Sequence, residues 1–267
     1  MPAEPVVSVV VPAHRVDAWL DRAVGSVLAS TDIDLELIVV FDGIAEAAPL
    51  WSTDPRVRLV FRPVSGGPSV AMQDGVDVAS GTYIARLDSD DLTDPERLAV
   101  QVAHLDAHPD TVAVAALVRI IDEDDRVTGS LTAPVGDDVR RRLLLYNFIA
   151  HSTVMFRRDA ALRIGGYDRA LRVMEDYEFL LRLATLGPIA QLDRRLVGYR
   201  LHTGQTSHSI ALRGPHIDAV LAGRRALAGA LGVGRVATWA RDALWGATRR
   251  WRARSSGAQI ARIRPEA

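Results

Sequence analysis

Residues 83–91 read Tyr83-Ile84-Ala85-Arg86-Leu87-Asp88-Ser89-Asp90-Asp91, and they join a short, mostly apolar strand directly to a cluster of aspartates. Two carboxylates separated by one residue at the end of a strand can bind a hard divalent ion, which also binds diphosphate oxygens. A solvated acidic turn or a helix N-cap explains the same residues, because Asp is favoured there and residues 92–95 open a helix. The stretch by itself leaves both interpretations open.

Strands and helices alternate on both sides of this cluster. Runs of β-branched and apolar residues predict strands, and apolar residues at three-and-four spacing predict helices. The predicted strands cover residues 6–11, 35–41, 57–61, 83–87, 112–121 and 152–156, and the predicted helices cover 16–29, 69–79, 96–107, 137–145 and 174–186. Such alternation is typical of a mostly parallel α/β sheet, in which ligands bind at the carboxyl ends of the strands.

The composition bounds the function. The chain has 267 residues, 48% of them hydrophobic, which suffices for one large domain with a buried core. Its 33 acidic and 32 basic residues nearly balance, which argues against a dedicated nucleic-acid binder. Cysteine is absent, so any metal must be held by oxygen or imidazole. Lysine is also absent, which excludes Schiff-base chemistry and a lysine-bearing phosphate loop.

Targeting signals are not visible in the sequence. The N-terminal residues lack the basic start and the longer apolar core of a signal peptide. No later stretch approaches the roughly 18 uninterrupted apolar residues of a membrane-spanning helix. We therefore expect a cytoplasmic protein, with the inner face of the membrane as the place for any peripheral association.

Several motifs, taken in order, resemble the family 2 glycosyltransferases. In the first half they are the segments 7–13, 42–43, 79–84, 87–91 and 95–98, and in the second half 147–158, 165–168, 175–178 and 199–202. Each motif is weakly specific, but their ordered combination over residues 6–208 is strong. The resemblance implies a GT-A fold, an α/β architecture with a mostly parallel central sheet flanked by helices. Residues 1–210 would form this domain, with a nucleotide-binding half over about 1–110 and an acceptor half over about 111–210.

The resemblance also implies which residues bind the donor nucleotide. Backbone groups of Pro12 and Ala13 would line the base pocket, Asp42 would accept a hydrogen bond from the base, and the backbone of Gly67 would approach the donor. An ordinary Asp-Gly turn and a simple loop before a helix are the structural alternatives for Asp42 and Gly67.

Two positions depart from the family pattern. Phe41 precedes Asp42 where family members often carry a second acid, and Met72-Gln73 stands where many have Arg-Asn. Because the positive charge of this arginine is lost, the identity of the donor and the affinity for it are in question.

Metal and phosphate ligands follow from the same resemblance. Asp90 would be the principal ligand of Mn²⁺ or Mg²⁺, with Asp88 touching the ribose or the metal through water, and Asp91 forming part of the entry to the next helix. His202 would reach the metal or the diphosphate, although a surface histidine is the simpler explanation. Arg200 would contact phosphate through charge-assisted hydrogen bonds.

Inversion at the anomeric carbon needs a general base on the acceptor side. The resemblance nominates Asp176, with Glu175 next in line and His151 lining the acceptor side. In a purely structural interpretation Glu175 and Asp176 start a helix, where acidic residues favour the macrodipole.

Residues 211–267 differ in composition from the rest of the chain. They contain arginine in large excess over acid, with a net charge of +8, and Trp239, Trp245 and Trp251 recur every six residues. We expect a helical appendage, which would either lie on an anionic membrane surface or pack as an ordinary helix pair with solvated arginines.

The predicted function is transfer of a sugar from a nucleotide-sugar donor to a saccharide or lipid-linked acceptor, with inversion. A catalytically silent domain that binds nucleotide-sugar or a partner is the alternative from another class. A sugar nucleotidyltransferase is disfavoured, because Pro12-Ala13-His14-Arg15 does not look like the glycine-rich basic loop of such enzymes.

Overall fold

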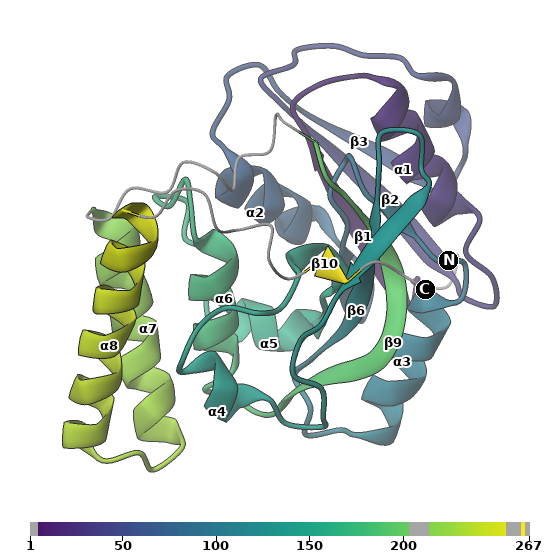
Figure 1. Cartoon of the computed structure of the whole chain (residues 1–267). Coiled ribbons are helices and arrows are strands. Elements are labelled where there is room, and N and C mark those ends of the chain that lie inside the picture. The colour runs from purple at the N-terminus through teal and green to yellow at the C-terminus, as the bar shows by residue number, and fades with distance from the viewer. Residues whose placement is uncertain (1–4, 203–213, 255–262, 265–267) are drawn as a thin grey trace.

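The computed structural model describes residues 5–202, 214–254 and 263–264. Its centre is one mixed sheet with the strand order β10-β7-β6-β8-β4-β1-β2-β3, and β9 pairs with both β5 and β6 (Figure 1). The strands are β1 Val7–Ala13, β2 Leu35–Asp42, β3 Val57–Arg62, β4 Tyr83–Arg86, β5 Leu92–Thr93, β6 Ala113–Ile121, β7 Val127–Leu131, β8 Met155–Arg157, β9 Ile189–Arg200 and β10 Ile263–Arg264. The helices are α1 Ala18–Leu28, α2 Pro68–Val78, α3 Arg97–Ala107, α4 Arg140–Leu143, α5 Arg158–Arg163, α6 Glu175–Leu183, α7 Pro215–Ala230 and α8 Arg235–Arg254, with 3₁₀ turns η1 Leu50–Thr53 and η2 His151–Thr153.

The first half of the chain forms the parallel sheet that the sequence predicts. β3, β2, β1 and β4 lie side by side and all run parallel. The β-branched residues of β1 and β2 are buried on both faces, as expected for strands covered by helices on each side, whereas the edge strand β3 is only partly buried. The carboxyl ends of β1, β2 and β4 therefore lie along one edge of the sheet.

Helices cover both faces of this sheet. α1 and α3 pack on one face, and α2, α5 and α6 on the other, as the two hydrophobic clusters show (Figure 1). α1 begins where Asp17 accepts hydrogen bonds from the N–H groups of Trp19 and Leu20, at 3.0 Å each. The N-cap fixes the start of the helix, which brings Trp19 to the carboxyl edge of the strands.

The second half makes the sheet mixed. β9 runs parallel to β6, whereas β7 and β8 pair antiparallel with their neighbours. Sequence reasoning missed β9 altogether and misplaced two elements nearby. The predicted strand at 152–156 is η2 followed by the short β8, and the predicted helix at 137–145 shrinks to α4.

The predicted helical appendage is present as α7 and α8, which lie beside α6 (Figure 1). α7 packs closely on α6, because Gly223 has no side chain and a Cβ there would lie 3.0 Å from Leu181 Cβ. Val220, Leu227 and Trp245 join the same hydrophobic cluster as α2 and α6. None of the helices among the described residues has the length and apolar character needed to cross a membrane.

Candidate active site

The predicted acid cluster lies directly after β4. Asp88 donates its N–H to Ser152 Oγ at 2.9 Å, and the N–H of Asp91 donates to the carbonyl oxygen of Asp88 at 3.1 Å. These contacts fold the segment into a tight turn. Asp88, Asp90 and Asp91 each direct a carboxylate oxygen into it, and these oxygens lie within 4.8 Å of one another.

Asp91 belongs to this cluster and not to a helix entry, so that prediction was wrong. It is 1% exposed and is followed by β5, while α3 begins only at Arg97. Its Oδ1 accepts the N–H of Arg200 at 2.9 Å. Burial, together with the charges of Asp88 and Asp90, raises the pKa of Asp91 well above its ordinary value.

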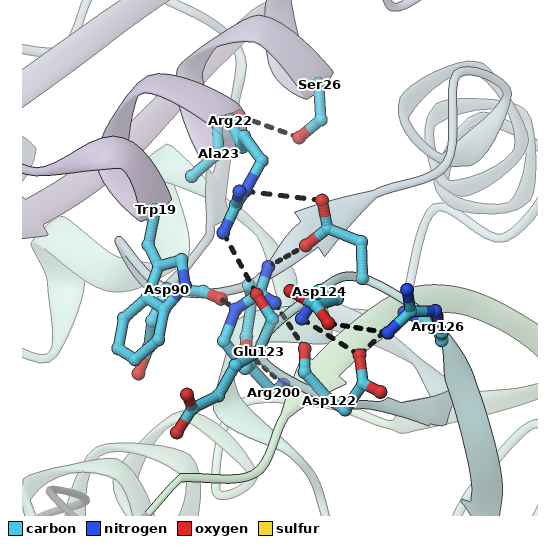
Figure 2. A network of polar contacts seen from close by, with 12 residues as sticks. Trp19, Arg22, Ala23, Ser26, Asp90, Asp122, Glu123, Asp124, Arg126 and Arg200 are labelled. Carbon is cyan, nitrogen blue, oxygen red and sulfur yellow. Dashed lines mark hydrogen bonds and ion pairs between the residues drawn. The ribbon is translucent and has the colours of Figure 1, made fainter.

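The end of β9 holds the cluster from the other side. Arg200 is fully buried and donates through Nε to the carbonyl oxygen of Asp90 at 2.7 Å (Figure 2). Its two terminal nitrogens donate to the carbonyl oxygen of Asp122 and to Asp125 Oδ1, at 2.5 Å each. The predicted phosphate contact would require an exchange of these bonds, and the geometry favours a role in holding the acidic turn.

His202 lies two residues further on and contacts the same aspartate. Its Nε2 is 2.8 Å from Asp90 Oδ2, and its ring lies 4.8 Å from that of Trp19, centre to centre. The Arg200 guanidinium lies 5.4 Å from the centre of the same Trp19 ring. His202 is therefore beside the acid cluster, where a metal or a diphosphate would be within its reach.

Asp42, at the end of β2, is nearly buried and holds the loop before α2. Oδ1 accepts the N–H of Gly66 at 2.7 Å, and Oδ2 accepts the N–H of Gly67 at 2.9 Å and the Ser65 hydroxyl at 2.6 Å. Arg62 Nε lies 3.3 Å from Oδ1. Burial raises the pKa of Asp42, but these hydrogen bonds and the Arg62 charge outweigh it and lower the pKa overall.

The predicted donor residues therefore lie together. Pro12 and Ala13 pair in register with Val40 and Phe41, which brings the end of β1 next to Asp42. Gly67 has a φ of 87° at the N-cap of α2, a conformation that favours glycine. In this arrangement the carboxylate of Asp42 shapes the loop, so a hydrogen bond to a base would compete with its present partners.

Glu175 and Asp176, the predicted base and its neighbour, open α6. Asn147 Nδ2 donates to Asp176 Oδ2 at 2.7 Å, and Asn147 Oδ1 in turn accepts the N–H of Ile149 at 3.2 Å. Burial, followed by the charge of Asp176, raises the pKa of Glu175 to about 7. Burial likewise raises the pKa of Asp176. Proton affinity near neutrality suits a general base.

Arg86 connects the two groups of carboxylates. It is 7% exposed and forms an ion pair with Asp88, with 2.5 Å between its terminal nitrogen and Oδ1. Its charge also acts on Glu175 and Asp176, and it lowers the pKa of both. The acid cluster is therefore paired with a buried cation whose charge also acts on the start of α6.

The chain is similar to known proteins in sequence and in fold. The glycosyl transferase family 2 profile matches residues 8–165. The chain belongs to glycosyltransferase family 2.

Relatives of this family 2 chain include two proteins named for polysaccharide biosynthesis. The succinoglycan biosynthesis protein ExoO of Rhizobium meliloti is 32% identical over 82% of this chain and 66% of its own length. The O-antigen biosynthesis glycosyltransferase WbnJ of Escherichia coli is 30% identical over 76% of this chain and 83% of its own. An uncharacterized protein of Sinorhizobium fredii is 37% identical over 67% of this chain, but that match spans only 20% of the relative.

Solved structures share the fold. The crystal structure of residues 1–349 of S. aureus TarS in complex with UDP-GlcNAc superimposes with a TM-score of 0.65 at 16% identity, over 90% of this chain and 70% of that one. At this identity the likeness shows the fold alone.

The acidic turn of this family 2 chain fits a divalent cation. Asp91 Oδ2 is buried and makes no hydrogen bond within the described residues. Arg86 uses one oxygen of Asp88 and His202 one oxygen of Asp90. Carboxylate oxygens are the ligands that Mg²⁺ and Mn²⁺ prefer.

His151 is buried in this family 2 domain, whereas a residue that lines an open acceptor site would be exposed. It is 7% exposed, and its Nε2 is 2.9 Å from the Tyr167 hydroxyl oxygen. Burial, followed by the charge of Arg86, lowers its pKa well below the ordinary value, so the ring is neutral. Its role on the acceptor side stays a prediction, and its present contact is with a buried tyrosine.

The departure at Met72-Gln73 has a structural consequence. Met72 is fully buried in the core, and Gln73 Oε1 accepts the N–H of Tyr167 at 2.6 Å while its Nε2 donates to Asp77 at 2.6 Å. Gln73 thus connects α2 to the loop that leads to α6.

Sequence reasoning did not find Arg86 or Asn147. Arg86 had a visible signal, because it is a charged residue at the end of an otherwise apolar strand, two residues before the acidic cluster begins at Asp88. Asn147 had no such signal, because nothing in its neighbourhood indicates a contact with a residue 29 positions away.

Proposed function

We propose that this chain is an inverting, metal-dependent glycosyltransferase that transfers a sugar from a nucleoside-diphosphate sugar to an acceptor hydroxyl. The observation that carries the proposal is the position of Arg86 between two sets of carboxylates. The set after β4 suits a cation and a diphosphate, and the set at the start of α6 suits a base. The chain thus contains carboxylates that would serve the departing diphosphate and a carboxylate that would take the proton of the acceptor.

The reaction assigns a separate task to each set. Asp176 accepts the proton of the acceptor hydroxyl, whose oxygen bonds to the anomeric carbon as the bond from that carbon to the diphosphate oxygen breaks. Attack from the face opposite the leaving group inverts the anomeric configuration. A divalent ion held by Asp90, with Asp88 and His202 beside it, would offset the charge on the departing diphosphate. Asn147 orients the Asp176 carboxylate.

The nucleotide would bind at the carboxyl ends of β1 and β2. Pro12, Ala13 and the Gly67 loop would form its walls there, and Asp42 would be the acceptor for a base N–H once it gives up a loop contact. A uridine diphosphate sugar is the first donor to test, because a structure with the same fold contains UDP-GlcNAc. The names of the relatives support a place in the synthesis of a cell-surface polysaccharide.

A thermal-shift screen of nucleotide-sugars, with and without Mn²⁺, would identify the donor, because a ligand of the native state raises its apparent stability. Donor hydrolysis without acceptor then tests turnover. We expect hydrolysis that requires Mn²⁺ and is abolished in Asp90→Asn. Asp124→Asn is the matched control, since Asp124 is 69% exposed and pairs only with Arg126 within the described residues.

A catalytically silent binding domain remains the competing function. It predicts a thermal shift with nucleotide-sugar but no Mn²⁺-dependent hydrolysis, and no transfer to any acceptor. The acid cluster and the raised pKa of Glu175 favour the enzyme, because a decayed site has no need to keep buried carboxylates together. A nucleotidyltransferase would instead release diphosphate from a nucleoside triphosphate and a sugar phosphate.

A further inference from the structure

The outer face of α8 is apolar although it lies in solvent. Val236 is 81% exposed, Trp239 72% and Leu244 60%. With about 100° between successive residues, these side chains and the exposed Ala240 and Ala243 share one side of the helix. We call these five residues the outer face of α8. Contiguous exposed apolar surface of this kind usually marks an interaction site.

The rotation of α8 is fixed from its opposite side. Trp245 is 6% exposed and lies against Tyr177 of α6, with 6.5 Å between the ring centres. The buried Arg224 of α7 donates through Nε to Asp242 Oδ1 at 2.9 Å and lies 5.3 Å from the centre of the Trp245 ring. These contacts hold the opposite side of α8 against α6 and α7, so the outer face points away from the domain. The helix is not loosely attached.

The charge of α8 indicates what kind of surface would cover the outer face. Arg235–Arg254 contains six arginines and one acid, so its net charge is +5. The acid is Asp242, which already pairs with Arg224 and Arg225. A helix that combines exposed tryptophan and aliphatic residues with an arginine excess suits an anionic lipid surface, where the apolar side chains enter the headgroup boundary.

We infer that the outer face of α8 binds the surface of a membrane that contains anionic lipids. Electrostatic attraction brings the arginine-rich helix to the surface, and Trp239 with Val236 and Leu244 inserts among the headgroups. A second copy of the chain is a poor alternative occupant, because two helices of net charge +5 would repel each other.

The anchor of α8 also connects the membrane face to the proposed catalytic helix. Arg224 donates to the Tyr177 hydroxyl at 3.1 Å, and Tyr177 follows Asp176 directly in α6. A chain held on the membrane through α8 would keep α6 at a fixed distance from the lipid surface. This step rests on the proposed function, and it would suit an acceptor that is attached to a lipid.

Vesicle flotation tests the inference with the full chain and without donor or acceptor. We expect the protein to float with vesicles of phosphatidylglycerol and phosphatidylcholine, to stay behind with pure phosphatidylcholine, and to detach as salt rises. Trp239→Glu should lower the partition coefficient about tenfold or more. Leu50→Glu is the matched control, because Leu50 is 94% exposed, lies in η1 and would add the same charge.

Donor hydrolysis by Trp239→Glu should equal that of the unaltered chain, which shows that the variant is folded and separates this inference from the proposed function. Failure of the unaltered chain to float on anionic vesicles would overturn the inference, as would equal flotation of Trp239→Glu and Leu50→Glu. A dimer in gel filtration that Trp239→Glu dissociates would assign the outer face to a second copy instead.

Discussion

Arg200 binds the main chain of Asp90 through its side chain, with 2.7 Å between Nε and the carbonyl oxygen, and thereby ties the acidic turn to β9 (Figure 2). The same guanidinium reaches Asp122 and Asp125 in the turn between β6 and β7, and Arg22 of α1 lies 3.3 Å from the other oxygen of Asp125. Three elements distant in sequence thus determine where the Asp90 carboxylate points. Outer contacts of this kind orient the ligands of a metal.

Arg200→Lys should weaken Mn²⁺ binding by about tenfold, because an ammonium cannot serve three acceptors in the fixed geometry of a guanidinium. Titration of Mn²⁺ followed by electron paramagnetic resonance measures this without any turnover. Arg126→Lys is the control, since Arg126 is exposed and pairs with the equally exposed Asp124. Unchanged Mn²⁺ affinity in a folded Arg200→Lys protein would contradict the role given to Arg200.

Asp176→Asn should lower kcat by about a hundredfold to ten-thousandfold, the usual contribution of a general base. Donor affinity, measured by calorimetry with Mn²⁺ present, should hardly change, because the proposed role of Asp176 is toward the acceptor and not the donor. Asn147→Ala should have a smaller effect, about tenfold on kcat, since the carboxylate keeps its charge but loses the amide that orients it. A large loss of donor affinity in Asp176→Asn would argue against the assignment.

The dependence of the transfer rate on pH should reflect the raised pKa values that burial causes at the start of α6. Burial and the neighbouring Asp176 raise the pKa of Glu175 to about 7, and burial raises that of Asp176 as well. A base works only when ionised, so activity should fall as the pH drops through the raised pKa of Asp176 and level off above it. Glu175→Gln removes the like charge next to Asp176, which makes ionisation of Asp176 easier and should move this acidic limb to lower pH. A limb that stays in place would show that Glu175 does not interact with the base.

Residues that sequence reasoning found share a local signature. Asp42, Asp88 and Asp90 each follow a strongly apolar strand, and parallel strands bring such ends to one edge. Asp176 and Glu175 open a helix with a clear apolar face. For these residues the strand and helix patterns, with the ordered resemblance, sufficed to predict the architecture, and their roles in the site stay predictions.

What the sequence concealed depends on distant partners. β9 escaped prediction because Asp193, Arg194 and Arg195 interrupt its apolar run, and in the structure these residues are exposed where the pairing with β6 shifts register. Asp91 looked like a helix entry because its partner Arg200 is 109 positions away. The residues next to Asp91 or within β9 do not indicate these contacts, because the contacts form only when distant segments pair in the folded sheet.

Asp42→Ala should destabilise the fold and weaken donor binding together. The carboxylate satisfies the N–H groups of Gly66 and Gly67 and the Ser65 hydroxyl, and removing it leaves these donors without their acceptor in a nearly buried place. We expect a loss of about 1–3 kcal/mol in the free energy of unfolding and a donor KM at least about tenfold higher. Urea unfolding and initial rates measure the two effects. Asp54→Ala is the control, because Asp54 pairs with Arg56 at the surface and its removal should leave both quantities nearly unchanged. If Asp42→Ala lost stability but kept its donor KM, Asp42 would serve the loop alone and the base would find its acceptor elsewhere.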